Sequence, residues 1–330
     1  MILLLLGGLF AAAVVYQKFS EYRDARHFSP PGRLISIDGR QLHFYAQGNG
    51  APAVILESGI AASSLTWAHV QPLLAKFTCA VSYDRPGLAW SELPSAAPTL
   101  ERMTKTLASL LDKAQIPPPY VLVGHSFGGL LVRAFAQERP DQVTGLVLVD
   151  PVSVETWAQC SDLNKRRLAR GVKLSRRGAW LARLGVVRLA LAAAARRNRR
   201  LTTVIAKTSA GAAMPFLTRL VGEIQKLPAE VLPAVRSHWS RAKAFQAMAA
   251  YLEALPQCAG IASKIIISPE IPVTILSAAN ATPAEIQERE EWVHQSKRGQ
   301  HLQIENTGHW LHLERPEMVA EAVRELAALR

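Results

Sequence analysis

A serine lies between two glycines in the spacing Gly124-x-Ser126-x-Gly128, directly after a short apolar run and at the start of a helical pattern. Glycines on both sides suit a sharp strand-to-helix turn, because neighbouring backbone there leaves no room for side chains. Such a turn exposes the serine hydroxyl, and the following helix N-terminus offers unpaired N–H groups and positive potential. The spacing therefore predicts that Ser126 is a nucleophile rather than one small residue in an incidental turn.

A serine hydroxyl is a weak nucleophile without a neighbouring base, so this prediction requires a histidine on a loop after a strand. His309 meets the requirement, because it follows the last predicted strand and Gly308 gives its loop room to turn inward. His312 is the alternative base, but its place near the final predicted helix favours a packing role. Strand alternation predicts that His125 points away from Ser126 and packs or forms hydrogen bonds.

The elements that must position these residues alternate along the chain. Short apolar runs separated by segments with helical spacing are typical of parallel strands that helices cover on both faces. A β-hairpin around Asp38-Gly39 precedes them. We therefore expect an α/β fold with one mostly parallel sheet of about eight strands. The predicted strands after the hairpin cover residues 52–59, 79–84, 120–124, 145–150, 270–278 and 301–306, and the predicted helices cover 64–77, 100–115, 126–138, a stretch from 283, and 316–329.

The strand rhythm stops after Asp150-Pro151 and returns at about residue 269. The intervening segment is rich in Ala, Leu and Arg and is punctuated by prolines, a composition typical of separate helices. The length of the chain leaves a second domain open. The simplest interpretation is one core, residues 33–151 and 269–330, with a helical cap, residues 152–268, inserted after the sixth strand. Such an insertion covers the crevice where open α/β sheets bind ligands.

The N-terminal segment is uncharged and strongly apolar from Ile2 to Val15, and a polar stretch follows it. As a helix this run reaches about 21 Å, which is shorter than the roughly 30 Å hydrocarbon layer. We expect residues 1–17 to be an uncleaved anchor that associates with a membrane through residues 2–16, and residues 18–32 to be a tether. Basic residues after the run favour a cytoplasmic catalytic domain, whereas a cleaved signal peptide, the alternative, would export the protein.

The net charge of +12 comes from one segment. Between Lys165 and Arg200 there are 13 Lys or Arg and no Asp or Glu, which leaves 25 basic and 26 acidic residues elsewhere. This segment is either a solvated surface or a site for a membrane or an acidic ligand. No aromatic-interleaved or zinc-binding motif accompanies the charge, so we do not expect nucleic acid as a partner. The three cysteines lack CxxC or paired-histidine spacing, so no metal site is expected.

The order of elements, together with the segments GHSFGG, YDRPG and TGHWLHLERPE, resembles the α/β-hydrolase fold family and its serine esterase and lipase-like members over about residues 33–330. The resemblance implies that the turn at Ser126 is the nucleophile elbow and that His309 is the base. It also implies an oxyanion hole formed by the backbone N–H groups of Phe127 and Ile60. YDRPG is shared with dehalogenases and epoxide hydrolases, but those enzymes need a carboxylate nucleophile where this chain has Ser126.

The third member of the triad is not at the position that relatives usually use. After the seventh predicted strand the sequence has no carboxylate until Glu285. Asp150, at the end of the sixth strand, is the better candidate for the triad acid, since some members of the fold use that position. Capping of the first helix of the insertion is its alternative role. Glu57 and Asp84 are more simply explained as a structural hydrogen-bonding residue and as the organiser of the YDRPG turn.

These residues predict a serine hydrolase that cleaves a carboxylic ester through an acyl-enzyme, with a small-molecule ester as its partner and no organic cofactor or metal. The cap and the apolar N-terminus favour an apolar acyl substrate. The same triad also serves amide hydrolysis, cleavage of carbon–carbon bonds and acyl transfer, so these alternatives stay open. A ligand-binding or receptor protein without catalysis is the alternative of another class. The sequence does not indicate an oligomeric state.

Overall fold

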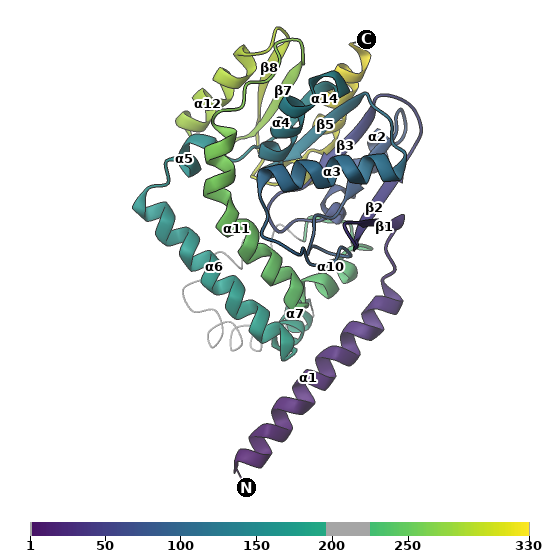
Figure 1. Cartoon of the computed structure of the whole chain (residues 1–330), viewed down its shortest axis with the longest axis vertical. Helices are drawn as coiled ribbons and strands as arrows, with labels where there is room; N and C mark the ends of the chain where they lie inside the picture. Colours follow the sequence, from purple (N-terminus) through teal and green to yellow (C-terminus); the bar gives the residue numbers. More distant parts are fainter. Residues whose placement is uncertain (1, 196–224, 330) are drawn as a thin grey trace.

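The computed structural model describes residues 2–195 and 225–329, which fold around one sheet of eight strands (Figure 1). The strand order is β1-β2-β4-β3-β5-β6-β7-β8, in which β1, β2 and β4 pair antiparallel and all other neighbours pair parallel. The expected mostly parallel sheet of about eight strands is therefore confirmed. The strands are Arg33–Ile37 (β1), Arg40–Gln47 (β2), Ala53–Glu57 (β3), Ala80–Tyr83 (β4), Tyr120–His125 (β5), Val143–Val149 (β6), Val273–Ala278 (β7) and Gly299–Ile304 (β8).

Helices cover both faces of the sheet because its central strands are apolar on both faces. In β5, Tyr120 and Leu122 pack into one buried layer with helices α3 and α4, whereas Val121 and Val123 pack into the opposite layer with α14. The helices outside the β6–β7 connection are Ile2–His27 (α1), Gln71–Leu74 (α2), Leu100–Ala114 (α3), Gly128–Glu138 (α4), Pro283–His294 (α12), Leu311–Glu314 (α13) and Pro316–Ala328 (α14), with short 3₁₀ helices at Ser64–Trp67 (η1) and Pro140–Gln142 (η2).

The prediction of one helix over residues 64–77 is wrong. The structure has the 3₁₀ helix η1 followed by the separate helix α2. Proline explains the break, because Pro72 has no N–H to donate and its ring would clash with the carbonyl of Ala68 in a continuous helix. Proline is tolerated in the first turn of a helix, and α2 begins at Gln71, one residue before it.

Helices α5, α6, α7, α10 and α11 lie between β6 and β7 along the chain (Figure 1). Helices α6 and α11 pack side by side through small residues, since Ser175, Ala179 and Ala182 of α6 are buried there. The ring of Phe245 on α11 lies against Gly178 of α6, where a Cβ would come within 2.5 Å. The bounds are Val154–Ala158 (α5), Asp162–Arg183 (α6), Val186–Ala195 (α7), Leu232–Trp239 (α10) and Ala242–Ala262 (α11).

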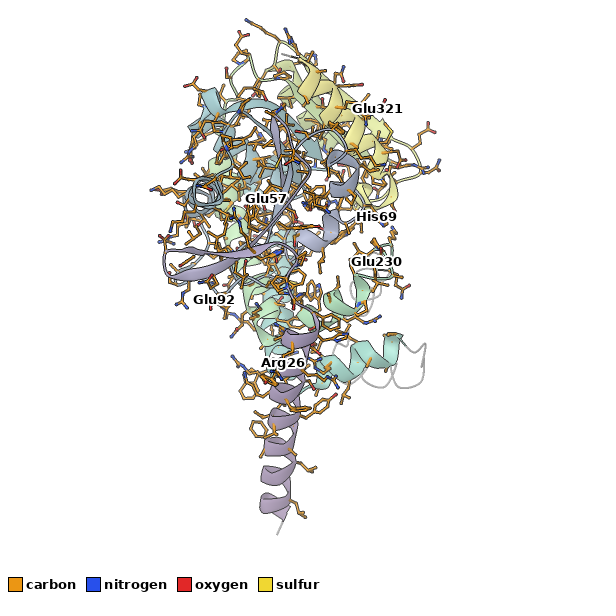
Figure 2. All side chains as sticks on the ribbon, turned by 90° about the vertical axis from the view of Figure 1, so that its right-hand side faces the viewer. Arg26, Glu57, His69, Glu92, Glu230 and Glu321 are labelled. Atoms are coloured by element: carbon orange, nitrogen blue, oxygen red, sulfur yellow. The ribbon has the colours of Figure 1, made fainter. Side chains whose placement is uncertain are left out.

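Helix α1 projects from the rest of the chain with its N-terminus outermost (Figures 1 and 2). Its C-terminal half is fixed, because Gln17 donates to the carbonyl of Ser240 at 2.9 Å and Asp24 pairs with Arg188 at 2.6 Å. The helix therefore continues through residues 18–27, where the sequence predicted a tether. By length and composition, no single helix in residues 2–195 and 225–329 qualifies as a membrane span, although α6 and α7, bent by 91°, qualify as a pair.

Candidate active site

The turn between β5 and α4 holds Ser126 in a conformation that serine rarely adopts. Its φ is 53°, in the left-handed region, and its N–H donates to the carbonyl of Val149 at 3.0 Å. Close packing explains the flanking glycines, because a Cβ on Gly128 would lie 2.5 Å from the carbonyl oxygen of Glu57. A Cβ on Gly124 would meet the backbone of Gly128 at 2.8 Å. The strained turn thus presents the hydroxyl of Ser126 at the carboxyl end of the sheet.

Asp150 directly follows the neighbouring strand β6 and is held by β7. Its φ is 40°, and its N–H donates to the carbonyl of Leu276 at 2.7 Å. One carboxylate oxygen, Oδ1, accepts from the backbone N–H of Ala278 at 3.1 Å and pairs with Arg289 Nη1 at 3.0 Å. Burial by itself would raise the pKa of Asp150, but the hydrogen bond from His309 and the charge of Arg289 lower it below its ordinary value. Asp150 is therefore a buried, ionised acceptor.

His309 lies between the other two residues. Its Nδ1 is 2.6 Å from Asp150 Oδ2, and its Nε2 is 3.0 Å from Ser126 Oγ. An ionised carboxylate can only accept, so Nδ1 carries the proton and Nε2 has a lone pair for the serine hydroxyl. The side chain of His309 is 38% exposed, which lets solvent reach this ring. The structure therefore brings Ser126, His309 and Asp150 into one hydrogen-bonded chain.

The two neighbouring histidines are buried. His125 Nε2 donates to the backbone carbonyl of His309 at 2.8 Å, which fixes the loop that carries the base. Burial lowers the pKa of His125 well below its ordinary value, and the nearby His312 and His309 lower it further. Burial also lowers the pKa of His312 to about 3. The His312 ring packs 4.7 Å from the ring of Trp67, so it is a neutral packing residue.

The loop after β3 lies against the serine. A Cβ on Gly59 would be 3.3 Å from the Cβ of Ser126, and Ile60 follows in the same loop. Arg85 fixes this loop through two hydrogen bonds: Nη1 donates to the carbonyl of Ser58 at 2.6 Å, and Nη2 donates to that of Gly59 at 2.5 Å. Phe127, the other residue expected to offer an oxyanion N–H, is the N-cap residue of α4 and is fully buried.

Glu57 lies in the interior of the molecule (Figure 2), where its buried carboxylate joins a hydrogen-bonded network. Its Oε1 accepts from Arg85 Nη1 at 2.5 Å, and its Oε2 accepts from the hydroxyl of Tyr83. Burial raises the pKa of Glu57 above its ordinary value, against the lowering effect of Arg85 and Tyr83. The ring of Tyr251, on helix α11, lies 4.8 Å from the guanidinium of Arg85 and connects the network to the β6–β7 insertion.

The structure does not bring Glu285 to the histidine. Its carboxylate accepts from the backbone N–H and the hydroxyl of Thr282, at 2.8 and 2.9 Å, in a capping box at the start of α12. Asp84 lies in a separate buried group, where it accepts from the backbone N–H of Ser64 at 2.8 Å and pairs with His43 at 2.9 Å. Neither carboxylate belongs to the hydrogen-bonded chain at Ser126.

Two arginines of this site were not predicted. Arg289 lies on α12, in a stretch that the sequence marked only as helical, and nothing in its spacing pointed to Asp150. Arg85 belongs to the YDRPG segment, so its position carried a signal, but its bonds to the loop after β3 depend on the pairing of β3 with β4. In the described part of the chain, no three or more His, Cys, Asp or Glu side chains are grouped to hold a metal ion.

Comparison with known proteins gives the family. The model of the Alpha/beta hydrolase family matches residues 54–322. Lipase LipV of Mycobacterium tuberculosis is 39% identical over 112 residues, which are 33% of this chain and 41% of that protein. A solved structure of the epoxide hydrolase CorEH has a TM-score of 0.65 at 19% identity and covers 90% of this chain and 99% of its own. A thermophilic esterase from Thermogutta terrifontis has a TM-score of 0.56 at 20% identity, with 89% and 97% covered.

These matches differ in what they show. The solved structures share less than a quarter of their residues with this chain, so they show the fold alone. The chain spans less than half the length of the curated relatives it matches, including the uncharacterized protein YqjL of Bacillus subtilis, at 33% identity. The family match, in contrast, includes Ser126, Asp150 and His309.

Proposed function

Because the chain belongs to the alpha/beta hydrolase family, we propose that it is a serine hydrolase that cleaves a carboxylic ester through an acyl-enzyme. The observation that carries this proposal is the continuous chain from Asp150 Oδ2 to His309 Nδ1, at 2.6 Å, and from His309 Nε2 to Ser126 Oγ, at 3.0 Å. Nucleophile, base and orienting carboxylate are thus within hydrogen-bond reach and in the order that acyl transfer requires.

In the proposed reaction His309 Nε2 takes the proton of Ser126 as Oγ attacks the ester carbonyl. Asp150 holds the imidazole in the required tautomer and stabilises the imidazolium that forms. The backbone N–H groups of Phe127, which directly follows Ser126, and of Ile60 stabilise the oxyanion in this proposal. His309 then protonates the departing alkoxide, and in the second half it activates water for attack on the acyl-enzyme.

The serine nucleophile favours esters over epoxides. Ring opening of an epoxide by the route expected from the family resemblance needs a carboxylate at the position of Ser126, whereas the fold likeness to CorEH carries no information on chemistry. The similarity to a lipase and the helices between β6 and β7 support an apolar acyl group. Amides, carbon–carbon bonds and acyl transfer use the same triad and stay open as alternatives for the substrate.

Covalent labelling tests the nucleophile. A fluorophosphonate forms a stable bond with an activated serine, so the wild-type chain should label at one residue and Ser126→Ala should not. His309→Ala and Asp150→Asn should label more slowly, and Glu285→Gln should label at the wild-type rate. Undiminished labelling of Ser126→Ala would contradict the proposal. No labelling of the folded wild type would favour the ligand-binding protein instead.

Turnover tests the substrate. We expect p-nitrophenyl esters of eight to twelve carbons to be cleaved at a higher kcat/KM than the acetate, by about tenfold or more, since each buried methylene adds about 0.8 kcal/mol. The matching p-nitroanilides, which are amides, should be poor substrates. Equal kcat/KM for acetyl and long-chain esters would remove the support for an apolar acyl group, and faster cleavage of the amides would reassign the bond.

A further inference from the structure

An exposed basic surface lies beside the projecting helix α1. We define the basic surface as the eight Lys and Arg side chains of α6, all of which are exposed; the same helix has a single acidic residue, Asp162. The side of α6 that carries Ser175, Ala179 and Ala182 is buried against α11, and the basic side chains lie on its remaining, exposed sides. Among them, Arg176 pairs with Glu253 of α11 at 2.6 Å. The eight residues are Lys165, Arg166, Arg167, Arg170, Lys173, Arg176, Arg177 and Arg183.

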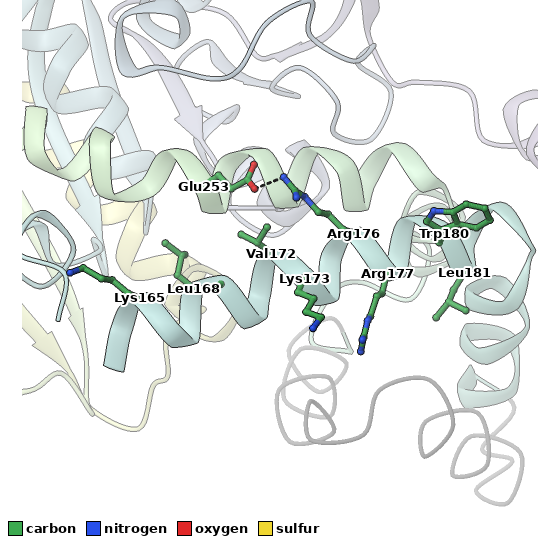
Figure 3. A pocket seen from close by; sticks show the side chains of 10 residues that line it. Lys165, Leu168, Val172, Lys173, Arg176, Arg177, Trp180, Leu181 and Glu253 are labelled. Carbon is green, nitrogen blue, oxygen red and sulfur yellow. Dashed lines mark hydrogen bonds and ion pairs between the residues drawn. The ribbon is translucent and has the colours of Figure 1, made fainter. Parts of the chain in front are cut away.

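Apolar side chains accompany the charge. A groove of about 950 Å³ along α6 is lined by basic residues together with Leu168, Val172, Trp180 and Leu181, and Glu253 is the acidic residue in its lining (Figure 3). The indole of Trp180 is 58% exposed although it is large and apolar. Exposed tryptophan among arginine and lysine side chains is typical of surfaces that lie at the headgroup level of a bilayer.

Helix α1 leaves the body next to this surface. The ring of Tyr16 packs against Gly185, two residues beyond α6, where a Cβ would come within 3.0 Å. N-terminal to this contact, Leu5, Leu9 and Phe10 are each more than half exposed. A projecting helix with no charge before Lys18 exposes apolar surface that needs a partner. The apolar half of α1 and the basic surface therefore meet at one corner of the molecule.

From this continuity we propose that the α6–α7 corner docks on a membrane of anionic lipids while the apolar half of α1 inserts into the same bilayer. The arginine and lysine side chains bind lipid phosphate and carboxylate groups, Trp180 enters the headgroup layer, and α1 contributes apolar contact. Charge complementarity selects anionic lipids over neutral ones. An apolar anchor and a basic patch together give stable binding where one alone gives weak binding.

Vesicle binding of the full chain tests this surface. Binding to vesicles with 30% phosphatidylglycerol should exceed binding to pure phosphatidylcholine and should weaken in high salt. The triple variant Lys173→Gln, Arg176→Gln and Arg177→Gln should lower partition into anionic vesicles on the order of 100-fold. A matched variant on α3, Arg102→Gln, Lys105→Gln and Lys113→Gln, removes the same charge from exposed positions elsewhere and should stay within about threefold of the wild type.

Tryptophan quenching gives a second measurement that does not depend on reversible binding. Brominated anionic lipids should quench part of the fluorescence, and Trp180→Phe should remove that part. Equal binding of both triple variants, or quenching unchanged in Trp180→Phe, would overturn the proposal. Retention by duplex DNA in preference to anionic vesicles would do so as well, because the surface would then serve a nucleic acid.

A separate observation concerns Arg85. The Gly59–Ile60 peptide is trans, so its carbonyl and its N–H point in opposite directions. Arg85 Nη2 holds the Gly59 carbonyl at 2.5 Å, and this contact therefore also sets the direction of the Ile60 N–H. The guanidinium of Arg85 is buried. Its central carbon lies 5.2 Å from the centre of the Phe127 ring, and its Nη1 donates to Glu57 at 2.5 Å.

We infer that Arg85, oriented by Glu57, is a positioning residue that aims the Ile60 N–H at the oxyanion, an inference that rests on the proposed acyl transfer. Lysine in its place keeps the charge but cannot donate to two loop carbonyls and Glu57 in one plane. A misdirected N–H stabilises the transition state less, and it changes the binding of the ground-state substrate only slightly. Loss of this contact should therefore lower kcat and leave KM nearly unchanged.

The test compares Arg85→Lys, Arg85→Ala and Glu57→Gln with the wild type, per active site titrated with fluorophosphonate. We expect kcat to fall about 10- to 100-fold in both Arg85 variants with KM within about threefold, and the pH dependence of kcat to be unchanged. Glu57→Gln keeps the charge of Arg85 and serves as the test if the Arg85 variants do not fold. We expect it to lower kcat as well, but by a smaller factor. Unchanged kcat per titrated site, or a change in KM alone, would overturn the role of Arg85, whereas an unlabelled wild type would overturn the proposed function itself.

Discussion

Within residues 2–195 and 225–329, two groups of serine, histidine and aspartate can be compared, and one of them has the geometry for acyl transfer. In the first, His309 contacts Ser126 with Nε2, at 3.0 Å, and Asp150 with Nδ1. In the second, Ser64 and Asp84 both lie at Nδ1 of His43, at 3.4 and 2.9 Å, and Nε2 faces the carbonyl of Pro31 at 2.6 Å. Residue types alone therefore do not distinguish the two groups.

The acceptors decide what each imidazole can do. In the second group a carbonyl and a carboxylate each require a donor, so both ring nitrogens of His43 carry protons and neither can act as a base. Burial by itself would lower the pKa of His43, but Asp84 raises it above its ordinary value. The side chains of His43 and Asp84 are fully buried, whereas His309 is 38% exposed. A catalytic histidine thus needs one ring nitrogen that is free to take a proton and a route to solvent, and of these two histidines His309 has both.

Matched serine substitutions should separate the two groups most strongly. We expect Ser126→Ala to lower kcat for ester hydrolysis by a factor on the order of 10⁴ to 10⁶, because the nucleophile is lost. Ser64→Ala should leave kcat within about threefold, since Ser64 does not face a basic nitrogen. Initial rates with a p-nitrophenyl ester check both. A large loss in Ser64→Ala with a wild-type rate in Ser126→Ala would exchange the assignments.

Matched aspartate substitutions come next in size. Asp150→Asn should lower kcat about 10³- to 10⁴-fold with little change in KM, because the amide no longer fixes the tautomer of His309. Asp84→Asn should instead lower the free energy of unfolding by about 3–5 kcal/mol, since it leaves a buried imidazolium without its partner. Urea unfolding and steady-state kinetics on both variants are the measurements. Full activity in Asp150→Asn would show that another residue is the triad acid.

The pH dependence of stability should show the charge on His43. Because the folded pKa is above 6.5, its stabilising effect is complete below the unfolded pKa and is lost as pH rises through the folded value. Asp84 has the opposite sign, since its pKa is below 3.8, so its effect is lost only as pH falls through that lower value. Unfolding curves of wild type and His43→Gln from pH 4 to 9 should differ most near pH 5–6, by about 3 kcal/mol, and converge at high pH. A constant difference up to pH 9 would mean that His43 is neutral.

The sequence predicted the fold and the first of these groups but gave no account of the second. Apolar strands and the turn at Ser126 are local patterns, and their consequences are local: β5 begins at Tyr120, as predicted, and ends at His125, one residue after the predicted end. His309 could be found because it follows the last strand. The contacts of His43 with Asp84 and Pro31 join three separate segments through the antiparallel pairing of β2 with β4, and no local pattern encodes that register.

The same reason explains the arginines. Arg289 reaches Asp150 only because α12 returns beside β7, and Arg85 reaches Gly59 only because β3 and β4 are parallel neighbours. Each contact depends on two elements whose relative placement is set by packing of the whole sheet. The N-terminal helix shows the reverse case: residues 18–27 look like a tether in the sequence, and contacts with partly buried residues such as Arg188 keep them helical.

Glu285→Ala should have the smallest effect and bears directly on the choice of the acid. The carboxylate closes the capping box with Thr282 and is only partly buried, so its loss should cost about 0.5–1 kcal/mol of unfolding free energy and leave kcat within about twofold. Thermal unfolding and ester turnover measured on one preparation check both numbers. Thr282→Ala is the control, because it opens the same cap from the other side and should lower stability by a similar amount. If Glu285→Ala instead lost ester turnover as completely as we expect of Asp150→Asn, with Thr282→Ala fully active, the role of triad acid would pass from Asp150 to Glu285, and α12 would have to rearrange before catalysis.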